Sequence, residues 1–303
     1  MQPEGPLSTA AVAFLAALSA RHYSPATVAT YQFDLRHLLE RVGEVAPASL
    51  TSHDIRRALA GLHGKGLKPK TLARTLSAWR SFFNYLARQS RAGRENAVQA
   101  NPCLGLRPPK SEKKLPNAPS VDAMAHLLAA EPDDVWAVRN LAMFELMYSA
   151  GLRRAELIGL DIGGLDLAAA EVTVIGKGAR TRVVPVGGKA LDAVRNWLAL
   201  RADVARADTT ALFVGLRGAR ISATVLAQAL KRLAVQQGIT AHMHPHALRH
   251  AFASHVLQSS GDLRAVQEML GHASLSTTQI YTHLDFQHLS QVYDQAHPRA
   301  KKK

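Results

Sequence analysis

Residues 242–283, HMHPHALRHAFASHVLQSSGDLRAVQEMLGHASLSTTQIYTH, decide how the C-terminal part of this chain folds and which chemistry it can carry. The region has an unusual composition, because nine of the 14 histidines of the chain lie after residue 241. Pro245 is typical of the first position of a helix. His246 and Arg249, three residues apart, then share one face of that helix. The stretch therefore presents a group that can carry a proton beside a permanent cation.

The second half of the stretch adds two more reactive side chains. Gly271 is typical of a helix end, which places His272 at the turn beyond it. Ser276 can cap a short third helix that carries Tyr281. A histidine, an arginine, a second histidine and a phenol, all at helix ends or on short helices, make a plausible set for chemistry on a phosphate.

The composition of the chain limits the number of domains and the kinds of binding partner that it suggests. Its 303 residues suggest two domains. The 37 Lys and Arg against 23 Asp and Glu give a formal charge of +14, which favours nucleic acid first and an anionic membrane second. The lone Cys103 excludes an internal disulfide and fits a reducing cytoplasm. We expect no signal peptide and no membrane insertion, because no apolar run approaches the ~20 residues of a membrane span.

Hydrophobic periodicity predicts a four-helix bundle in residues 1–90. The helices are expected at 7–20, from 25 to 43, from 51 to 64 and from 69 onward, with short connections between them. Their outward faces carry many cations and few acids. Such a face is usually only solvated, but it would also suit a DNA backbone. The candidate DNA contacts are Arg56, Arg57, Lys68, Lys70, Arg74 and Arg80, with Lys65 and Arg88 beside them.

Residues 91–119 change character and are predicted to form a basic linker. Prolines punctuate the segment, and it includes the run KSEKK at 110–114. Two domains on such a tether could close around a duplex as a clamp. The plain alternative is a spacer.

Residues 120–303 are predicted to form a second, mixed α/β domain that is mostly helical. The only clear strand signals, Glu171–Ile175 and Arg182–Val184, predict an antiparallel hairpin with Lys177 at its turn. The turn resembles a phosphate-binding loop but lacks the spaced glycines of a P-loop, so we expect no nucleotide hydrolysis. The expected helices are 120–130, 134–150, 152–157, 188–204, 222–237, those of the 242–283 stretch, and a terminal amphipathic helix at about 285–296. That last helix could pack on its own domain or on a neighbouring copy.

Arg153 and Glu156 lie at the break that Gly151 makes between two helices. Three residues apart, they can reach the same side. Such a pair is commonly a surface ion pair that contributes little. On a phosphodiester, however, two arginines such as Arg153 and Arg249 could hold both non-bridging oxygens. A tyrosine could act as the nucleophile and a lysine as the acid for the leaving group.

A metal site is the competing interpretation of the histidines. His242, His244 and His246 alternate as in a metal-binding tract. Pro245 interrupts them, and the acids after residue 241 are few. A metal-dependent phosphodiesterase usually needs carboxylate ligands. The pattern therefore favours chemistry without a metal.

Taken together, the motifs resemble the tyrosine recombinase (phage integrase) family. The resemblance covers the whole chain, most closely from about residue 140. Four separated blocks carry it in the family's order: SAGLRRAEL (149–157), VIGKG (174–178), PHALRHAFASH (245–255) and LGH through QIYTH (270–283).

The resemblance implies a role for each motif residue. Lys177 would protonate the 5′ leaving oxygen, Tyr281 would become linked to the 3′ phosphate, and Glu156 would support the first arginine. The residues around the scissile phosphate would be Arg153, His246, Arg249 and His272. The phosphotyrosine would store the bond energy, so neither metal, ATP nor another cofactor is implied.

The resemblance also implies partners and a division of labour. Residues 1–90 would be a core-binding domain on double-stranded DNA, and residues 120–303 the catalytic domain, with the helix at 285–296 docked on a neighbouring subunit. A second recombinase would complete a heterotetramer on a short site, and a septal DNA translocase would control the reaction through a Holliday junction. The alternatives are a phage or integron integrase of the same family, a metal-dependent nuclease, and a non-catalytic DNA-architectural protein.

Overall fold

The computed structural model describes residues 2–91, 98, 100–110, 118–176, 181–239, 243–271 and 283–300. The chain divides into two compact units, Met1–Leu115 and Pro116–Lys303. The division falls inside the segment 91–119 that the sequence predicts to be a linker. Each unit has its own hydrophobic core, so each is described by itself.

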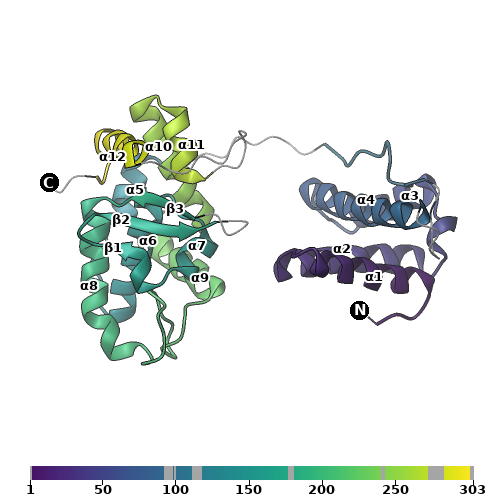
Figure 1. The fold of residues 1–303 in the computed structure, drawn as a ribbon, viewed down its shortest axis with the longest axis horizontal. Helices are drawn as coiled ribbons and strands as arrows, with labels where there is room; N and C mark the ends of the chain where they lie inside the picture. The colour runs from purple at the N-terminus through teal and green to yellow at the C-terminus, as the bar shows by residue number, and fades with distance from the viewer. Residues whose placement is uncertain are drawn as a thin grey trace. The chain divides into compact units, whose positions relative to one another are not determined.

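Four α-helices form the described part of the N-terminal unit, which confirms the predicted bundle. They are α1 (Pro6–Ala20), α2 (Pro25–Val42), α3 (Ser52–Gly64) and α4 (Pro69–Arg91), with a short 3-10 helix at Pro47–Ser49 (Figure 1). Local sequence sets their starts. Ser24 accepts a hydrogen bond from the N–H of Thr27 at the start of α2. Thr51 and Asp54 form a capping box at the start of α3.

The apolar face of α4 organises the core of this unit. Phe14 of α1 meets Phe82 of α4 edge-on, with ring centroids 5.6 Å apart. Trp79 donates its indole N–H to the carbonyl of Asp34 at 2.7 Å and so joins α4 to α2. The apolar stripe along α4 is buried throughout: Leu72, Leu76, Trp79, Phe83 and Leu86.

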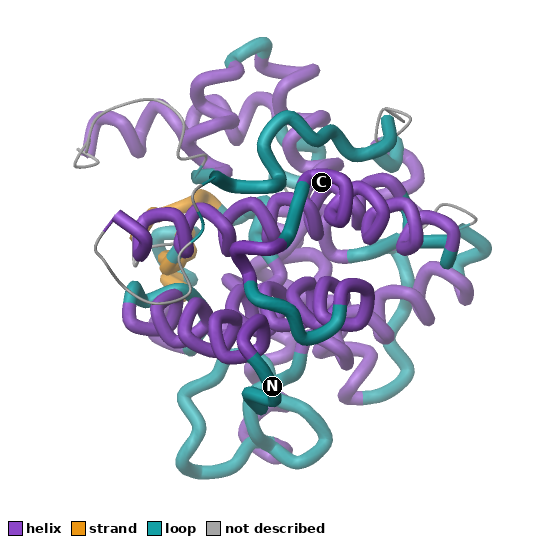
Figure 2. Tube along the Cα trace, turned by 90° about the vertical axis from the view of Figure 1, so that its right-hand side faces the viewer, coloured by secondary structure: helices purple, strands orange, loops and turns teal. Residues whose placement is uncertain are grey.

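The C-terminal unit is mainly helical, with strands confined to one small region (Figure 2). No helix in the described ranges combines the length and apolar character needed to cross a bilayer. The helices are α5 (Val121–Leu127), α6 (Val135–Ser149), α7 (Arg154–Gly159), α8 (Gly188–Val204), α9 (Ala223–Gln236), α10 (Pro245–Ser260), α11 (Leu263–Leu270) and α12 (His283–Ala296), with a 3-10 helix at Ile162–Gly164.

Within the described residues, the sheet has three antiparallel strands in the order β1-β2-β3. The predicted hairpin is confirmed as β2 (Glu171–Ile175) and β3 (Thr181–Pro185), with Ile175 opposite Thr181. The sequence did not predict β1 (Leu165–Asp166), because two residues are too few to show alternation. Lys177, at the predicted turn, lies outside the described residues.

Helix α6 runs through the centre of the C-terminal unit. Its residues 142–149 are all buried, and it packs against α8, α9 and α10. Because α6 is enclosed, the turn that follows it at Gly151 is fixed relative to the rest of the core. That turn leads directly to Arg153.

Helix α12 packs on its own unit, against α10, α11 and β3 (Figure 1). Tyr293 is fully buried, and its hydroxyl lies 2.5 Å from that of Ser149 at the end of α6. Beyond the helix, Arg299 forms an ion pair with the buried carboxylate of Glu145. Polar as well as apolar contacts therefore hold the C-terminal helix in place.

Candidate active site

The turn between α6 and α7 places Arg153. Gly151 adopts a positive φ of 57°, and a Cβ there would overlap the ring of Phe252 on α10. Only glycine satisfies both conditions without strain. Arg153 is the N-cap of α7, and its backbone N–H donates to Glu156 Oε2 at 2.8 Å. The predicted proximity of Arg153 and Glu156 is therefore present in the structure.

Glu156 is the centre of a cluster of arginines from three elements. Its side chain is only 3% exposed. Arg153 Nη1 donates to Oε1 at 2.7 Å, and Arg182 of β3 donates to both carboxylate oxygens at 2.7 and 2.8 Å. Arg249 of α10 lies 3.9 Å from Oε2. Burial alone would raise the pKa of Glu156, but the hydrogen bonds from Arg182 and Arg153 overcome it and lower the pKa to about 2.

Arg249 is aimed by helix α10 and held by two carbonyl groups. Pro245 is the first residue of the helix, as predicted, and His244 caps it by accepting the N–H of Ala247 at 3.0 Å. Arg249 donates to the carbonyls of Gly151 and Leu270 at 2.5 and 2.6 Å. Burial, followed by the charge of Arg153, lowers the pKa of Arg249 to about 10. The guanidinium therefore remains charged at neutral pH.

The end of α11 is bound by the same three arginines. Three consecutive carbonyls each accept one hydrogen bond: Met269 from Arg182 at 3.0 Å, Leu270 from Arg249 and Gly271 from Arg153 at 3.1 Å. Cations at the C-terminal end of a helix also interact favourably with its dipole. The position from which the chain leads to His272 is thus tied to the arginine cluster.

The arginine cluster leaves an excess of positive charge next to an accessible surface. Three guanidiniums share one carboxylate, and the Arg153 side chain is 37% exposed. The Arg249 side chain is 11% exposed. Guanidiniums that are fixed before a substrate arrives are the condition for electrostatic stabilisation of a charged transition state.

The other predicted catalytic residues are only partly described. His246 lies exposed in the first turn of α10, with its ring centroid 6.2 Å from that of His244. His272, Tyr281 and Lys177 lie outside the described residues. The structure thus brings Arg153, Glu156 and Arg249 together and places His246 one helical turn before Arg249.

Arg182 is the member of the cluster that sequence reasoning missed. It is 6% exposed and faces Glu156 from the sheet. A signal was present, because alternation in β3 puts Arg182 on the same side as the buried Val184. An arginine at an inward-facing strand position requires a buried partner.

The cations predicted to contact DNA differ in their surroundings. Arg56, Lys68 and Lys70 are exposed. Arg57 pairs with Asp54 at 3.1 Å on the surface of α3. Arg74 and Arg80 both have contacts within the N-terminal unit.

Those contacts explain the orientation of Arg74 and Arg80. Arg74 donates Nε and Nη2 to the fully buried Asp34, at 3.1 and 2.9 Å, yet its side chain is 49% exposed. Arg80 donates to the carbonyl of Leu106 at 3.0 Å. Arg74 is thus an oriented surface cation, whereas Arg80 fastens residues 101–106 to α4.

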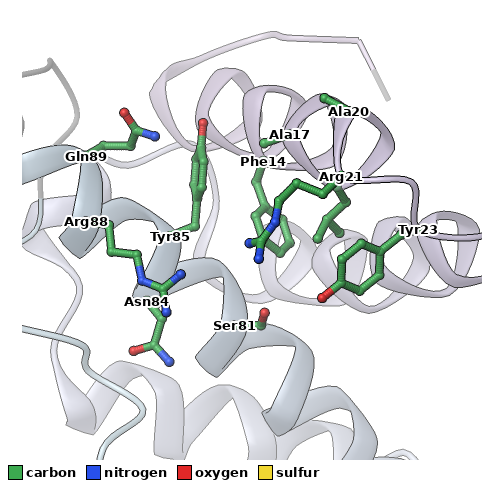
Figure 3. Close-up of a pocket in the computed structure, with 11 residues that line it drawn as sticks. Phe14, Ala17, Ala20, Arg21, Tyr23, Ser81, Asn84, Tyr85, Arg88 and Gln89 are labelled. Atoms are coloured by element: carbon green, nitrogen blue, oxygen red, sulfur yellow. The ribbon is translucent and has the colours of Figure 1, made fainter. Parts of the chain in front are cut away.

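A hollow of about 550 Å³ lies between α1 and α4 of the same unit. Figure 3 shows Arg21 and Tyr23, from the end of α1, and Tyr85 and Arg88, from α4, arranged around it. Phe14 contributes an apolar wall. The described residues that line it include two cations and no carboxylate, so they extend the positive surface of this unit.

Comparison with known proteins assigns both units to one family. Residues 120–288 match the model of the phage integrase family, and residues 11–90 match that of the phage integrase N-terminal SAM-like domain. The chain is 49% identical over 288 residues to the tyrosine recombinase XerC of Alcanivorax borkumensis, covering 94% of this chain and 92% of that protein. It is 48% identical over 305 residues to XerC of Ralstonia pickettii, covering 93% and 91%.

A solved structure shares the fold. The XerH site-specific recombinase bound to palindromic difH substrate, in a post-cleavage complex, superposes with a TM-score of 0.71 at 23% identity, over 91% of this chain and 81% of that chain. The chain therefore belongs to the phage integrase family, which confirms the resemblance. Its activity is that of a XerC-like tyrosine site-specific recombinase.

Proposed function

We propose that this recombinase cuts and rejoins DNA through a covalent bond between Tyr281 and a 3′ phosphate. The Tyr281 phenol oxygen attacks phosphorus, the bond to the 5′ oxygen breaks, and Lys177 gives that oxygen a proton. A histidine accepts the phenol proton. The observation that carries the proposal is the arginine cluster on Glu156, which holds Arg153 and Arg249 beside one accessible surface.

In this proposal Arg153 and Arg249 bind the non-bridging oxygens of the scissile phosphate, and His246 and His272 complete its surroundings. Glu156 supports Arg153 and does not touch the substrate. Because the arginines supply the charge, the reaction requires no metal. Because the phosphotyrosine conserves the energy of the broken bond, it requires no ATP. Cleavage that persists in excess chelator is the expected result, and its abolition would favour a metal-dependent nuclease.

The decisive experiment uses a nicked recombination site, which traps the covalent intermediate. Wild-type protein should form an adduct with DNA that survives denaturant, and Tyr281→Phe should form none. Lys177→Ala should cleave ordinary DNA slowly and recover on a substrate with a good leaving group at the 5′ position. An adduct with Tyr281→Phe would contradict the assignment of the nucleophile.

We further propose that residues 1–90 form the core-binding domain, 91–119 the linker, and 120–303 the catalytic domain. The N-terminal unit would hold the duplex through exposed cations such as Lys68, Lys70 and Arg74. Removing one cation that binds a phosphate should reduce the salt dependence of DNA binding by about one unit of slope. Mobility-shift titrations of single alanine variants at several salt concentrations test this assignment.

The similarity to XerC proteins supports a housekeeping role at cell division. We propose that the protein resolves chromosome and plasmid dimers in the cytoplasm, in a heterotetramer with a XerD-like recombinase and under control of an FtsK-like translocase. Helix α12 would then leave its own unit and dock on a neighbouring subunit. A plasmid with two recombination sites should be resolved only when the XerD-like partner is present. Resolution without that partner would favour a phage or integron integrase.

A further inference from the structure

Arg182 makes contacts that link three elements of the proposed active site. Its Nε donates to the carbonyl of Met269, and its two Nη atoms donate to the two oxygens of Glu156. With 6% of its surface exposed, it is directed into the protein. One side chain thereby connects β3, α7 and the end of α11.

The position of Arg182 in the sheet also connects the β2–β3 hairpin to these elements. Arg182 lies opposite Val174 in the register of β2 and β3. It is five residues after Lys177 in the sequence. Strand β3, which follows the proposed acid Lys177, is thus hydrogen-bonded through Arg182 to the Glu156 carboxylate, and that carboxylate also binds Arg153.

We propose that Arg182 is a positioning residue for DNA cleavage: it fixes Glu156 and the end of α11 relative to each other, and through them Arg153, Arg249 and the segment leading to His272. This inference rests on the proposed function of those residues. Arg182 touches neither phosphate nor tyrosine in this scheme, so its effect on the reaction is transmitted by its neighbours.

The geometry favours positioning over a purely structural ion pair. Buried ion pairs contribute little net stability compared with well-packed apolar residues, so stability alone does not call for an arginine here. The planar guanidinium does what an apolar side chain cannot, because it joins a carboxylate and a carbonyl in fixed directions. Space around it is also restricted, since a Cβ at Gly271 would lie 3.1 Å from Arg182 Cδ.

Among the described residues, the charged groups that face Glu156 are Arg153 at the N-cap of α7, Arg182 of β3 and Arg249 of α10. Removing Arg182 takes away both of its hydrogen bonds to the carboxylate. The pKa of Glu156 should then rise, because burial that raises it is no longer offset to the same extent. Activity should consequently become more sensitive to acid than that of the wild type.

The test compares Arg182→Met with Arg201→Met in the full-length protein. Arg201 is a matched control: it is 8% exposed and donates to the carbonyls of Thr209 and Ala211, on a helix without proposed catalytic residues. Both variants should have a lower free energy of unfolding than the wild type in urea titrations. Arg182→Met should also form the covalent adduct roughly 100-fold more slowly at unchanged DNA affinity, because small misplacements of catalytic groups have effects of that size. Arg201→Met should cleave at nearly the wild-type rate.

A pH series separates positioning from a general loss of structure. The ratio of the Arg182→Met rate to the wild-type rate should fall as the pH drops from 7 to 5. Adding Glu156→Gln to Arg182→Met should remove that fall. If Arg182→Met does not fold, Arg182→Lys serves instead: it keeps the charge but loses the fork, and should cleave slowly without the extra acid sensitivity.

Two outcomes would overturn the inference. If Arg182→Met or Arg182→Lys cleaves as well as Arg201→Met at every pH, Arg182 is only structural. If the wild type itself forms no adduct on the nicked site, the proposed function fails, and the positioning role fails with it.

Discussion

The ring of Phe252 lies so close to Gly151 that any Cβ at that glycine would overlap it. Gly151 comes two residues before Arg153, and Phe252 three residues after Arg249. Arg249 also donates to the carbonyl of Gly151 at 2.5 Å. The relative positions of Arg153 and Arg249, the two proposed phosphate-binding arginines, therefore depend on the contact between Gly151 and the ring of Phe252.

Gly151→Ala should damage both the fold and the reaction. The new methyl group would push Phe252 away and strain a backbone with φ of 57°. We expect the free energy of unfolding, measured in urea, to fall by about 1–3 kcal/mol. The rate of adduct formation should fall by more than the fraction of unfolded protein accounts for. Gly159→Ala is the control, because a Cβ there meets nothing within 4 Å. Equal behaviour of the two variants would contradict the proposed role of the Gly151 turn.

Arg249→Lys should leave the protein folded and bound to DNA but nearly inactive. An ammonium cannot reach the carbonyls of Gly151 and Leu270 and also face a phosphate in the direction a guanidinium does. The rate of adduct formation should fall roughly 100-fold or more, as for the loss of one fixed donor to a transition state. Arg264→Lys, at a side chain of α11 that is 78% exposed, is the control. An active Arg249→Lys enzyme would show that charge alone is sufficient.

Arg74→Gln should weaken the N-terminal unit as well as its hold on DNA. The substitution leaves the fully buried Asp34 without its bidentate partner. Because Asp34 is buried and loses two of its hydrogen bonds, the free energy of unfolding should fall by about 1–3 kcal/mol. Arg57→Gln, which breaks only an exposed pair with Asp54, should leave the free energy of unfolding nearly unchanged. Urea titrations and mobility shifts of both variants separate the structural effect from the loss of phosphate binding.

His297 should make the C-terminal helix sensitive to acid. Its pKa is lowered from 6.5 to about 3 by burial, so the unfolded chain binds a proton at a higher pH than the folded one. The stability that depends on neutral His297 is complete above pH 6.5 and is lost as the pH falls towards 3. Between pH 7 and 5 the loss should reach about 2 kcal/mol. His297→Gln should reduce this slope in urea titrations, whereas His53→Gln, on an exposed residue, should not.

Sequence alone was sufficient where a short-range signal determines the structure. Pro245 marked the first residue of α10, and the helix expected from residue 25 begins at Pro25 as α2. The strand pattern predicted both ends of β2. The pairing of Arg153 with Glu156 followed from their spacing of three residues. In each case the partner lies within one turn or one strand, so no knowledge of the tertiary fold was needed.

Contacts between distant segments were beyond that reasoning. The third arginine at Glu156 comes from β3, 26 residues further along the chain. The carboxylate that orients Arg74 lies 40 residues before it. Arg74 and Arg80 looked equivalent in sequence, yet one is an oriented surface cation and the other holds the chain near Leu106. Such distinctions arise only when folding brings unrelated segments together.

The charge of the arginine–glutamate cluster has a consequence for how the enzyme can be controlled. Between the pKa of Glu156, about 2, and that of Arg249, about 10, neither group titrates. Shifts in cellular acidity therefore cannot turn this part of the machinery on or off. Under the proposed function, this fixed charge would wait for substrate in every compartment, and the rate of strand exchange would depend on when Tyr281 reaches the phosphate.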